Sequence, residues 1–419
     1  MASVPISRPP KIPSRIDRRI YGMGRTWIRW TCLPLVLAVF LGISEADVAA
    51  GAPTERVVGS LRPDALKDGL GSVVCISPAR CVAVGAQTVG TKVGSIAATT
   101  SDGGRTWSST PIIPGGNGLS SLACPTARIC VAVGERGKGY QGDAIRSSDG
   151  GRTWTLDPPL PKSFGYLRSI SCPTRKYCIA VGTSVDQNIA TATALVTNDS
   201  GRTWSRKILP SGEEELFSVT CTSRRDCVAD GTLEASIGNP TVGFLNSIIV
   251  TSDGGSTWRQ SSLPVGTSPV MGFPRFGDVT CVGRTHCLIV GDATPPDGNP
   301  SGFIIESTDG GRTWSYDVVP PSTNILNAVT CVTASECVVA GGGIEPRGNS
   351  VQDLLSTSDG GGTWTSHSVP LSVFLSGISC PTMSSCIAVG SGLSARNPTI
   401  EPGAVVVTHD GGGTWTSQS

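Results

Sequence analysis

CPTRKYCIAVG at residues 172–182 and TNDSGRTW at residues 197–204 are the two parts of a unit that the chain repeats seven times. The tryptophans that end the second part stand 47 to 56 residues apart, and the seven units fill residues 70–419. A fixed period of this length is the signature of architectures built from one repeated supersecondary unit. We therefore interpret residues 70–419 as a single repeat domain.

The first part of the unit contributes two cysteines with five residues between them. This spacing is longer than is usual for zinc, and the chain has only three histidines, His286, His367 and His409. Hairpin disulfides in an oxidising compartment are therefore favoured over metal sites. The expected pairs are Cys75/Cys81, Cys124/Cys130, Cys172/Cys178, Cys221/Cys227, Cys281/Cys287, Cys331/Cys337 and Cys380/Cys386.

The second part has the form Ser/Thr-x-Asp-x-Gly-x-Thr-Trp. An aspartate at the head of a tight turn accepts hydrogen bonds from backbone N–H groups, and glycine supplies a positive φ. Each copy has a single aspartate, which does not fit a calcium loop, so we predict a structural turn with a buried tryptophan. The residues are Asp102, Asp149, Asp199, Asp253, Asp309, Asp359 and Asp410, with Trp107, Trp154, Trp204, Trp258, Trp314, Trp364 and Trp415.

Each unit contains four short apolar or β-branched runs bounded by turn residues, which is typical of strands. We name them A to D: the cysteine pair brackets the A–B turn, and the aspartate motif forms the C–D turn. Seven four-stranded sheets favour radial packing, which buries both sheet faces and leaves only short edges. The predicted fold is all-β, a seven-bladed β-propeller of four-stranded antiparallel blades with one hairpin disulfide per blade. Seven complete sets of strands would close the ring without exchanging a strand.

The N-terminal 50 residues are typical of a secretory signal peptide. Residues 31–44 are uncharged and mostly apolar, Arg25 and Arg29 precede them, and small residues follow. The run is shorter than the roughly 20 residues of a spanning helix, so cleavage is favoured over an uncleaved membrane anchor, and no transmembrane span is expected in the mature chain. Met23 is an alternative start. Residues 51–69 are expected to form a linker or an extra outer strand.

Composition agrees with export and excludes one class of partner. The chain of 419 residues has 53 glycines, 30 prolines and 16% charged residues, against about 25% charged residues in an average domain. There is no Lys/Arg-rich run beyond the leader, so no nucleic-acid partner is expected. No cofactor or metal is expected either, and the sequence predicts a monomer that is secreted or held in the cell envelope.

The aspartate motif resembles the Asp-box, or bacterial neuraminidase repeat, of sialidase and sortilin-type propellers. The Ala-Val-Gly ending of strand B, as in Cys178-Ile-Ala-Val-Gly182, combined with Asp-Gly-Gly-Arg-Thr-Trp, is most similar to the photosystem II assembly-factor group. That group is seven-bladed, whereas sialidases are six-bladed. The resemblance implies a protein-binding role.

Function is expected on the face opposite the cysteine pairs. Strand alternation places the A–B and C–D turns on one face and the variable B–C and D–A connections on the other. Candidate ligand contacts in those connections are Arg136, Tyr140, Arg275, Arg347 and Arg396. The prediction is a binding or assembly module for an unknown protein or glycan, without catalysis; the alternative is a sialidase-like or other glycoside hydrolase.

Overall fold

The computed structural model describes residues 69–418 except for 90–91, 115–116, 137–140, 157–159, 187–188, 234–244, 265–272, 295–300, 322, 345–349, 352, 370–372 and 393–402. The predicted signal peptide at 1–50 and nearly all of the predicted linker at 51–69 lie outside the described residues and stay predictions. No helix within the described residues is long and apolar enough to cross a membrane.

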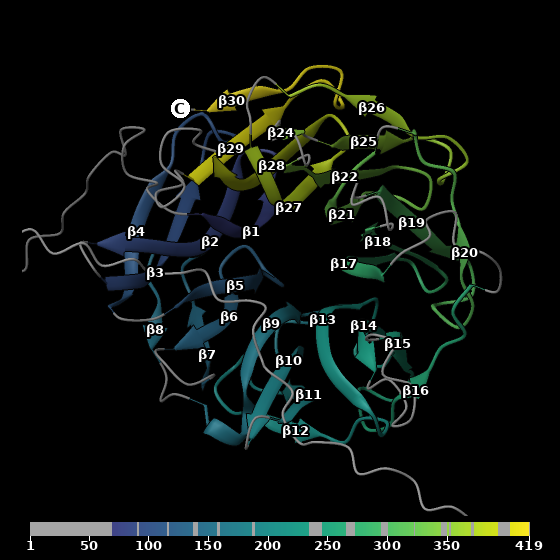
Figure 1. Cartoon of the computed structure of the whole chain (residues 1–419). Coiled ribbons are helices and arrows are strands. Elements are labelled where there is room, and N and C mark those ends of the chain that lie inside the picture. The colour runs from purple at the N-terminus through teal and green to yellow at the C-terminus, as the bar shows by residue number, and fades with distance from the viewer. Residues whose placement is uncertain are drawn as a thin grey trace, which may run out of the picture. The chain divides into compact units, whose positions relative to one another are not determined.

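Seven four-stranded antiparallel sheets form the blades of a β-propeller, as the sequence predicts (Figure 1). The strands of each sheet come from one contiguous stretch of the chain, so the ring closes without strand exchange. The first strands contact one another in order around the ring, and β27 returns to β1. These inner strands are β1 (Leu70–Ser77), β5 (Gly118–Ala123), β9 (Tyr166–Ser171), β13 (Glu213–Cys221), β17 (Phe273–Val282), β21 (Leu326–Cys331) and β27 (Val373–Thr382).

The other strands follow outward in sequence order. Second strands are β2 (Arg80–Val89), β6 (Cys130–Arg136), β10 (Cys178–Asp186), β14 (Cys227–Leu233), β18 (His286–Thr294), β22 (Cys337–Gly341) and β28 (Ser385–Gly392). Third strands are β3 (Lys92–Thr100), β7 (Gln141–Ser147), β11 (Ile189–Thr197), β15 (Leu245–Thr251), β19 (Ser301–Ser307), β25 (Leu354–Thr357) and β29 (Gly403–Thr408).

The fourth, outer strands are short and begin one residue after each motif tryptophan. They are β4 (Ser108–Pro114), β8 (Thr155–Leu156), β12 (Ser205–Lys207), β16 (Arg259–Gln260), β20 (Ser315–Tyr316), β26 (Thr365–His367) and β30 (Thr416–Gln418). A 3₁₀ turn, η2 (Lys162–Phe164), precedes β9, and a small ribbon of β23 (Gly343–Ile344) and β24 (Ser350–Val351) interrupts blade 6.

Seven apolar clusters hold the ring together, and each fills an interface between neighbouring blades. Trp107 of blade 1, for example, packs in one cluster with Ile387, Val389 and Val405 of blade 7. From the sequence we expect each motif tryptophan to pack in the core of its own blade. This expectation is wrong: the tryptophans lie between blades, because each sheet has its apolar faces turned toward its neighbours. Trp154 and Trp204 are only half-buried, whereas Trp107 is 8% exposed.

Every inner strand carries a β-bulge at the residue four positions before its first cysteine. The register with the second strand skips this residue in all seven blades. Opposite the bulge stands the repeat glycine, such as Gly231, where an added Cβ would collide with the carbonyl oxygen of Glu215. The close approach of two backbones therefore explains this glycine in every unit, and a bulge re-aims the side chain that it carries.

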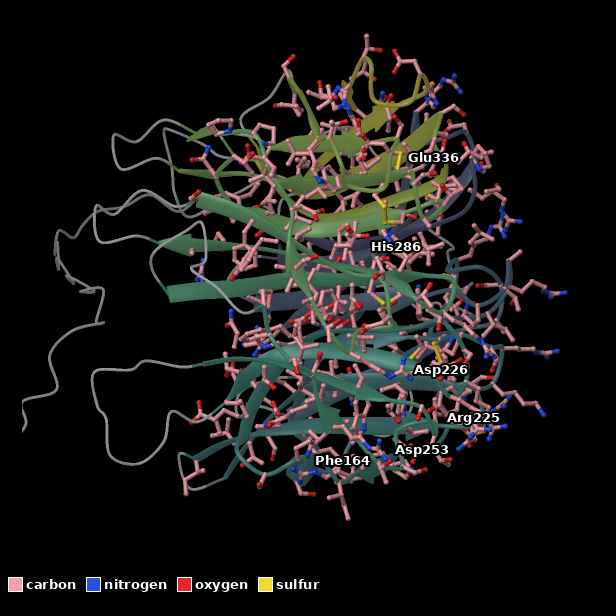
Figure 2. All side chains as sticks on the ribbon, turned by 90° about the vertical axis from the view of Figure 1, so that its right-hand side faces the viewer. Phe164, Arg225, Asp226, Asp253, His286 and Glu336 are labelled. Atoms are coloured by element: carbon pink, nitrogen blue, oxygen red, sulfur yellow. A yellow bond between two sulfur atoms is a disulfide. The ribbon has the colours of Figure 1, made fainter. Side chains whose placement is uncertain are left out.

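All seven predicted disulfides are present, one in each A–B hairpin. The A–B turns and aspartate motifs lie on one face, which we call the hairpin face, because their backbones are hydrogen-bonded to each other, as from Gly254 N–H to the Arg225 carbonyl at 3.0 Å. In Figure 2 the labelled Arg225, Asp226 and Asp253 lie toward the same end of the blades as the disulfides. The opposite face, with the B–C and D–A connections, is called the loop face.

The second cysteine of each pair has a further role that the sequence did not predict. Cys81 and Cys386 form the predicted hairpin disulfides, and in addition both residues are buried and only 1% exposed. Cys81 packs in the apolar cluster between blades 1 and 7, and Cys386 in the cluster between blades 6 and 7. The physical reason is that strand B begins at this cysteine and turns it toward the neighbouring blade. Cys81 and Cys386 are therefore core residues and are not accessible to a ligand.

Hydrogen bonds from its own turn hold the aspartate of each motif. In blade 3, Asp199 Oδ1 accepts from Thr203 N–H at 2.9 Å and from the Thr197 hydroxyl at 2.8 Å, and Oδ2 accepts from the Thr203 hydroxyl at 2.6 Å. Burial alone would raise the pKa of Asp199, but these hydrogen bonds outweigh it, so the pKa is lowered from 3.8. The aspartate therefore closes the turn, as the sequence predicts.

We expect Asp199→Ala to lower the free energy of unfolding by about 1 kcal/mol, because it leaves turn donors without an acceptor. Asp199→Asn should cost less, because its amide oxygen still accepts from Thr203 N–H. The wild-type advantage is present above the unfolded pKa and is lost as the pH falls through the lowered folded pKa. Urea unfolding at neutral and acid pH measures both effects, and equal stability of the alanine variant at neutral pH would contradict the structural role.

Candidate functional site

The sequence-predicted ligand contacts do not form one site among the described residues. Arg136 ends β6 and pairs with the buried Asp143 at 3.0 Å, and Arg275 on β17 pairs with Asp292 at 3.4 Å. These two arginines belong to blades 2 and 5, which are not neighbours, and each is bound to an acid of its own blade. The other three candidates, Tyr140, Arg347 and Arg396, lie outside the described residues.

The bulged residues of the inner strands line a cavity of about 160 Å³ in the central channel. Four blades contribute Gly or Ser here, whereas Arg168, Phe217 and Asn327 of blades 3, 4 and 6 are large. The channel is therefore asymmetric although the repeats are similar. The residues in ring order are Gly71, Ser120, Arg168, Phe217, Gly277, Asn327 and Ser376.

A polar network holds Arg168 in this channel. Its Nη2 donates to the Tyr166 hydroxyl at 2.9 Å and lies 3.5 Å from a carboxylate oxygen of Glu215. The guanidinium also lies over the rings of Tyr166 and Phe217, at 5.1 and 5.4 Å from their centroids. Tyr166 and Arg168 lie on β9 of blade 3, and blade 4 supplies Glu215 and Phe217. These contacts hold the guanidinium against the channel wall, although Arg168 Nε has no hydrogen-bond partner among the described residues.

Three adjoining grooves between blades lie on the hairpin face. Groove 1, between blades 2 and 3, has a volume of about 210 Å³; groove 2, between blades 3 and 4, about 180 Å³; and groove 3, between blades 4 and 5, about 470 Å³. Asn198 lines both groove 1 and groove 2, and the adjacent residues Arg225 and Asp226 line grooves 2 and 3 respectively. The three grooves therefore follow one another around this rim.

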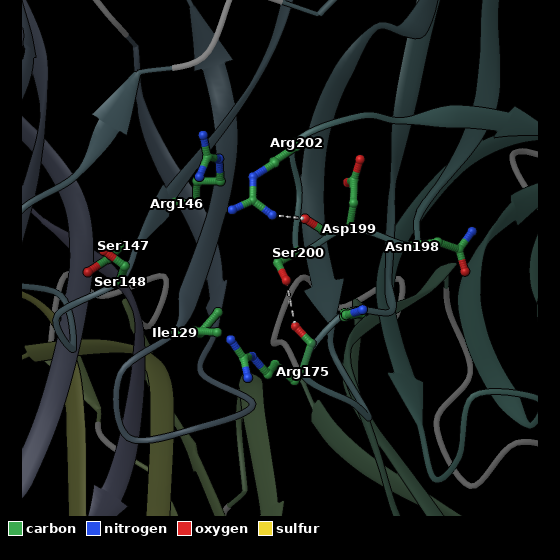
Figure 3. A pocket seen from close by; sticks show the side chains of 10 residues that line it. Ile129, Arg146, Ser147, Ser148, Arg175, Asn198, Asp199, Ser200 and Arg202 are labelled. Carbon is green, nitrogen blue, oxygen red and sulfur yellow. Dashed lines mark hydrogen bonds between the residues drawn. The ribbon is translucent and has the colours of Figure 1, made fainter.

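Cationic side chains line all three grooves, and we call this set the cationic band. Figure 3 shows groove 1, where arginines from blades 2 and 3 meet. On the same face, blades 6 and 7 carry glycine at the position of the motif arginine, Gly362 and Gly413. The grooves of the band span blades 2 to 5, although Arg105 and Arg152 also lie on this face, outside the grooves. It consists of Arg146, Arg175, Lys176 and Arg202 in groove 1, Lys207, Arg224 and Arg225 in groove 2, and Arg259, Arg284 and Arg312 in groove 3.

Neutral oxygen atoms position several of these cations. Arg202 and Arg312 donate to the carbonyls of the aspartates in their own motifs at 3.2 and 2.7 Å. Arg225 donates to the Ser252 carbonyl at 3.3 Å, and Arg224 to the amide oxygen of Asn198 at 2.9 Å. Because a neutral acceptor fixes a guanidinium without cancelling its charge, these groups keep a positive potential at the groove mouths.

The carboxylates that line the grooves are committed to their own turns. Hydrogen bonds from the side chain and backbone of Thr257 lower the pKa of Asp253 to about 2, and Asp226 accepts from the Ser223 hydroxyl at 2.8 Å. Ten cations therefore face three carboxylates, Asp199, Asp226 and Asp253, across the three grooves. The arrangement suits an anionic ligand that follows the rim.

Among the described residues, one group has the composition of a metal site: His286 with Cys331 and Cys337. The two sulfur atoms are bonded to each other in a disulfide. They are therefore not thiolates, and the group does not fit zinc.

Sequence reasoning missed the cationic band because its members are scattered along the chain. The two largest runs of positive charge there are pairs, Arg175–Lys176 and Arg224–Arg225. An arginine stands at the same motif position in four of the seven repeats, Arg105, Arg152, Arg202 and Arg312. This signal could have revealed the band, since turns of one type share a face of a propeller.

These features define a seven-bladed β-propeller with a cationic, grooved hairpin face. The chain matches no protein-family model, and no curated protein matches it either.

Solved structures are similar to this chain in fold. One is described as YCF48 bound to D1 peptide, with 15% sequence identity, a TM-score of 0.53, and coverage of 86% of this chain and 98% of that chain. Another is described as an ulvan lyase of polysaccharide lyase family PL25, with 11% identity, a TM-score of 0.54, and coverage of 85% and 97%. At these identities the likeness shows the fold alone, and the fold serves both a peptide-bound protein and a lyase.

Proposed function

We propose that this protein is an exported binding or assembly module whose partner is a protein with an acidic segment, held along the cationic band. The observation that carries the proposal is the gathering of ten cations in three adjoining grooves, against three hydrogen-bonded carboxylates. Seven disulfides, which are typical of an oxidising compartment, support export.

The hairpin face supports binding better than the loop face. On the loop face, Arg136 and Arg275 are paired with acids. A protein partner is favoured because an extended acidic segment can place successive carboxylates in successive grooves, where planar guanidinium groups bind them. The structure described as YCF48 bound to D1 peptide shows that a propeller of similar fold binds a peptide in that protein.

Charge reversal in groove 1 tests the proposal. We expect Arg175→Glu/Lys176→Glu/Arg202→Glu to weaken binding of a fluorescent peptide of ten glutamates by about tenfold or more, because each exposed pair contributes up to about 1 kcal/mol. Fluorescence anisotropy at low and physiological salt measures the affinity, and wild-type binding should weaken as salt screens the band.

The matched control is Arg105→Glu/Arg128→Glu/Arg152→Glu, which makes the same change of charge at three exposed arginines of the same face in blades 1 and 2, outside the band. It should bind the peptide with an affinity close to that of the wild type. Equal losses in both proteins would indicate a non-specific charge effect, and an unchanged triple variant would reject the band as the docking surface. Tighter binding of an anionic polysaccharide than of the peptide would favour a glycan partner instead.

A further inference from the structure

One position breaks the sevenfold repeat in the interior of the fold. The third residue after the second cysteine of each pair is apolar in six blades but is Asp230 in blade 4. The side chain of Asp230 is fully buried. A buried, unpaired charge is costly, so this aspartate needs a partner. The equivalent residues are Val84, Val133, Val181, Val290, Ala340 and Val389.

A second departure from the repeat faces the first. The residue three positions before the first cysteine is Ser, Ala or Gly in six blades but is Asp278 in blade 5. Ser218 lies directly opposite Asp230 in the register of β13 and β14, and its hydroxyl donates to Asp278 Oδ1 at 2.7 Å. The charges of Asp230 and Asp278 consequently interact across the interface of blades 4 and 5.

Hydrogen bonds distinguish the two carboxyl groups. Asp278 Oδ1 also accepts from Val279 N–H at 2.9 Å, and Oδ2 accepts from Val329 N–H of blade 6 at 3.1 Å. Apart from a weak interaction with Ser218 N–H, the oxygens of Asp230 have no hydrogen-bond partner among the described residues. Donors stabilise a carboxylate, so Asp278 is the ionised member and Asp230 the neutral one.

The surroundings agree with this assignment. Burial, followed by the charge of Asp278, raises the pKa of Asp230 well above its usual range. Burial raises the pKa of Asp278 to about 6. Its side chain also borders the channel, so protons from solvent can reach the pair.

Other charged groups on the neighbouring strands have partners of their own. Arg168 on β9 is paired with Glu215 on β13, and Asp292 on β18 with Arg275 on β17. Glu213, also on β13, accepts from the hydroxyl of Ser247 on β15 at 2.8 Å. Blade 6 contributes the uncharged Asn327 and the Val329 N–H from β21.

We propose that Asp230 and Asp278 hold one proton between them, which resides on Asp230, and that this neutral–ionised pair is a pH-sensitive latch between blades 4 and 5, because loss of the proton leaves two negative charges buried at their interface. A carboxyl group whose pKa is higher in the folded than in the unfolded protein takes up a proton on folding. Its stabilising contribution is fully present below the unfolded pKa and is lost as the pH rises through the folded pKa. The latch therefore holds in acid and weakens toward alkaline pH.

Two asparagine variants test the assignment of the proton. Asp230→Asn is neutral at every pH, so its melting temperature should fall less than that of the wild type between about pH 5 and pH 8. In Asp278→Asn, an amide N–H replaces one of the carboxylate oxygens that accept from Val279 N–H and Val329 N–H, so two donors face each other. This variant should therefore melt several degrees below the wild type at both pH values. The other buried acids are present in the wild type and in both variants, so their titration cancels when the melting temperatures of these proteins are compared.

Two further measurements make the result decisive. The infrared C=O stretching band of a protonated carboxyl should be present in the wild type and weaker in Asp230→Asn. Asp230→Val introduces the residue found in most other blades, and its melting temperature should also depend less on pH than that of the wild type. If Asp230→Asn keeps the wild-type pH profile, the shared proton is rejected. If calcium raises the melting temperature of the wild type but not of Asp230→Asn, the pair is a cation site instead.

Discussion

Replacement of Trp107 by alanine is expected to lower the free energy of unfolding by about 3–5 kcal/mol, the usual cost of removing a large buried aromatic side chain. Trp107 belongs to the cluster that joins blade 1 to blade 7, and the indole Nε1 also donates to the Gly104 carbonyl at 3.0 Å. The substitution opens a cavity where the ring closes, and no covalent bond or shared strand among the described residues compensates there. Denaturant unfolding followed by far-ultraviolet circular dichroism, which reports on the backbone and not on tryptophan, measures the loss of stability.

Trp204→Ala is the matched control, since Trp204 ends the same motif in blade 3 but is half-buried. Its cost should be smaller than that of Trp107→Ala, because less apolar surface is lost. If Trp107→Ala leaves the unfolding midpoint unchanged, the apolar cluster does not hold the ring closed. If the two variants are equally destabilised, burial is not what sets the cost.

Reduction of the seven disulfides is expected to have the largest effect of all. Each joins cysteines six positions apart, and closing so short a loop stabilises the fold by about 2 kcal/mol through the entropy of the unfolded chain, or roughly 14 kcal/mol for all seven. That is comparable with the whole stability of an ordinary domain, about 5–15 kcal/mol. Protein refolded from denaturant with reductant should therefore remain unfolded, as measured by circular dichroism.

The control is the same refolding with the disulfides left intact, which should restore the native spectrum. A single pair removed as Cys221→Ala/Cys227→Ala should lower the stability by only about 2 kcal/mol and leave the fold intact. Full recovery of native structure in reductant would show that the apolar clusters suffice and that the disulfides are dispensable.

Most of the fold could be predicted from sequence because it depends on local, repeated signals. The cysteine spacing fixed the A–B hairpin, Asp199 and its equivalents marked the C–D turn, and the count of seven units gave the number of blades. The location of the tryptophans between blades was missed, and so was the burial of Cys81 and Cys386 in the same interfaces. The reason is that the faces of a sheet that meet a neighbour are not specified by a pattern within one unit.

The candidate site was predicted far less well. The sequence favoured the variable loop face, yet Arg136 and Arg275 there are bound to Asp143 and Asp292, partners that lie 7 and 17 positions away along the chain. The hairpin face was interpreted as structural because its turns are nearly constant. That interpretation holds for the aspartates, but the arginines beside them line the grooves.

By itself, the sequence of this protein determined the strands, the disulfide pairs, the turns and the number of blades, because each follows from contacts between residues close in the chain. Only the tertiary structure decided which charges meet. Arg146 and Arg312 lie more than 160 positions apart in the sequence yet belong to one band, and Asp230 faces Asp278 across a blade interface. The physical reason is that a closed ring brings equivalent positions of successive repeats side by side, so the potential at each groove depends on residues that no local pattern connects.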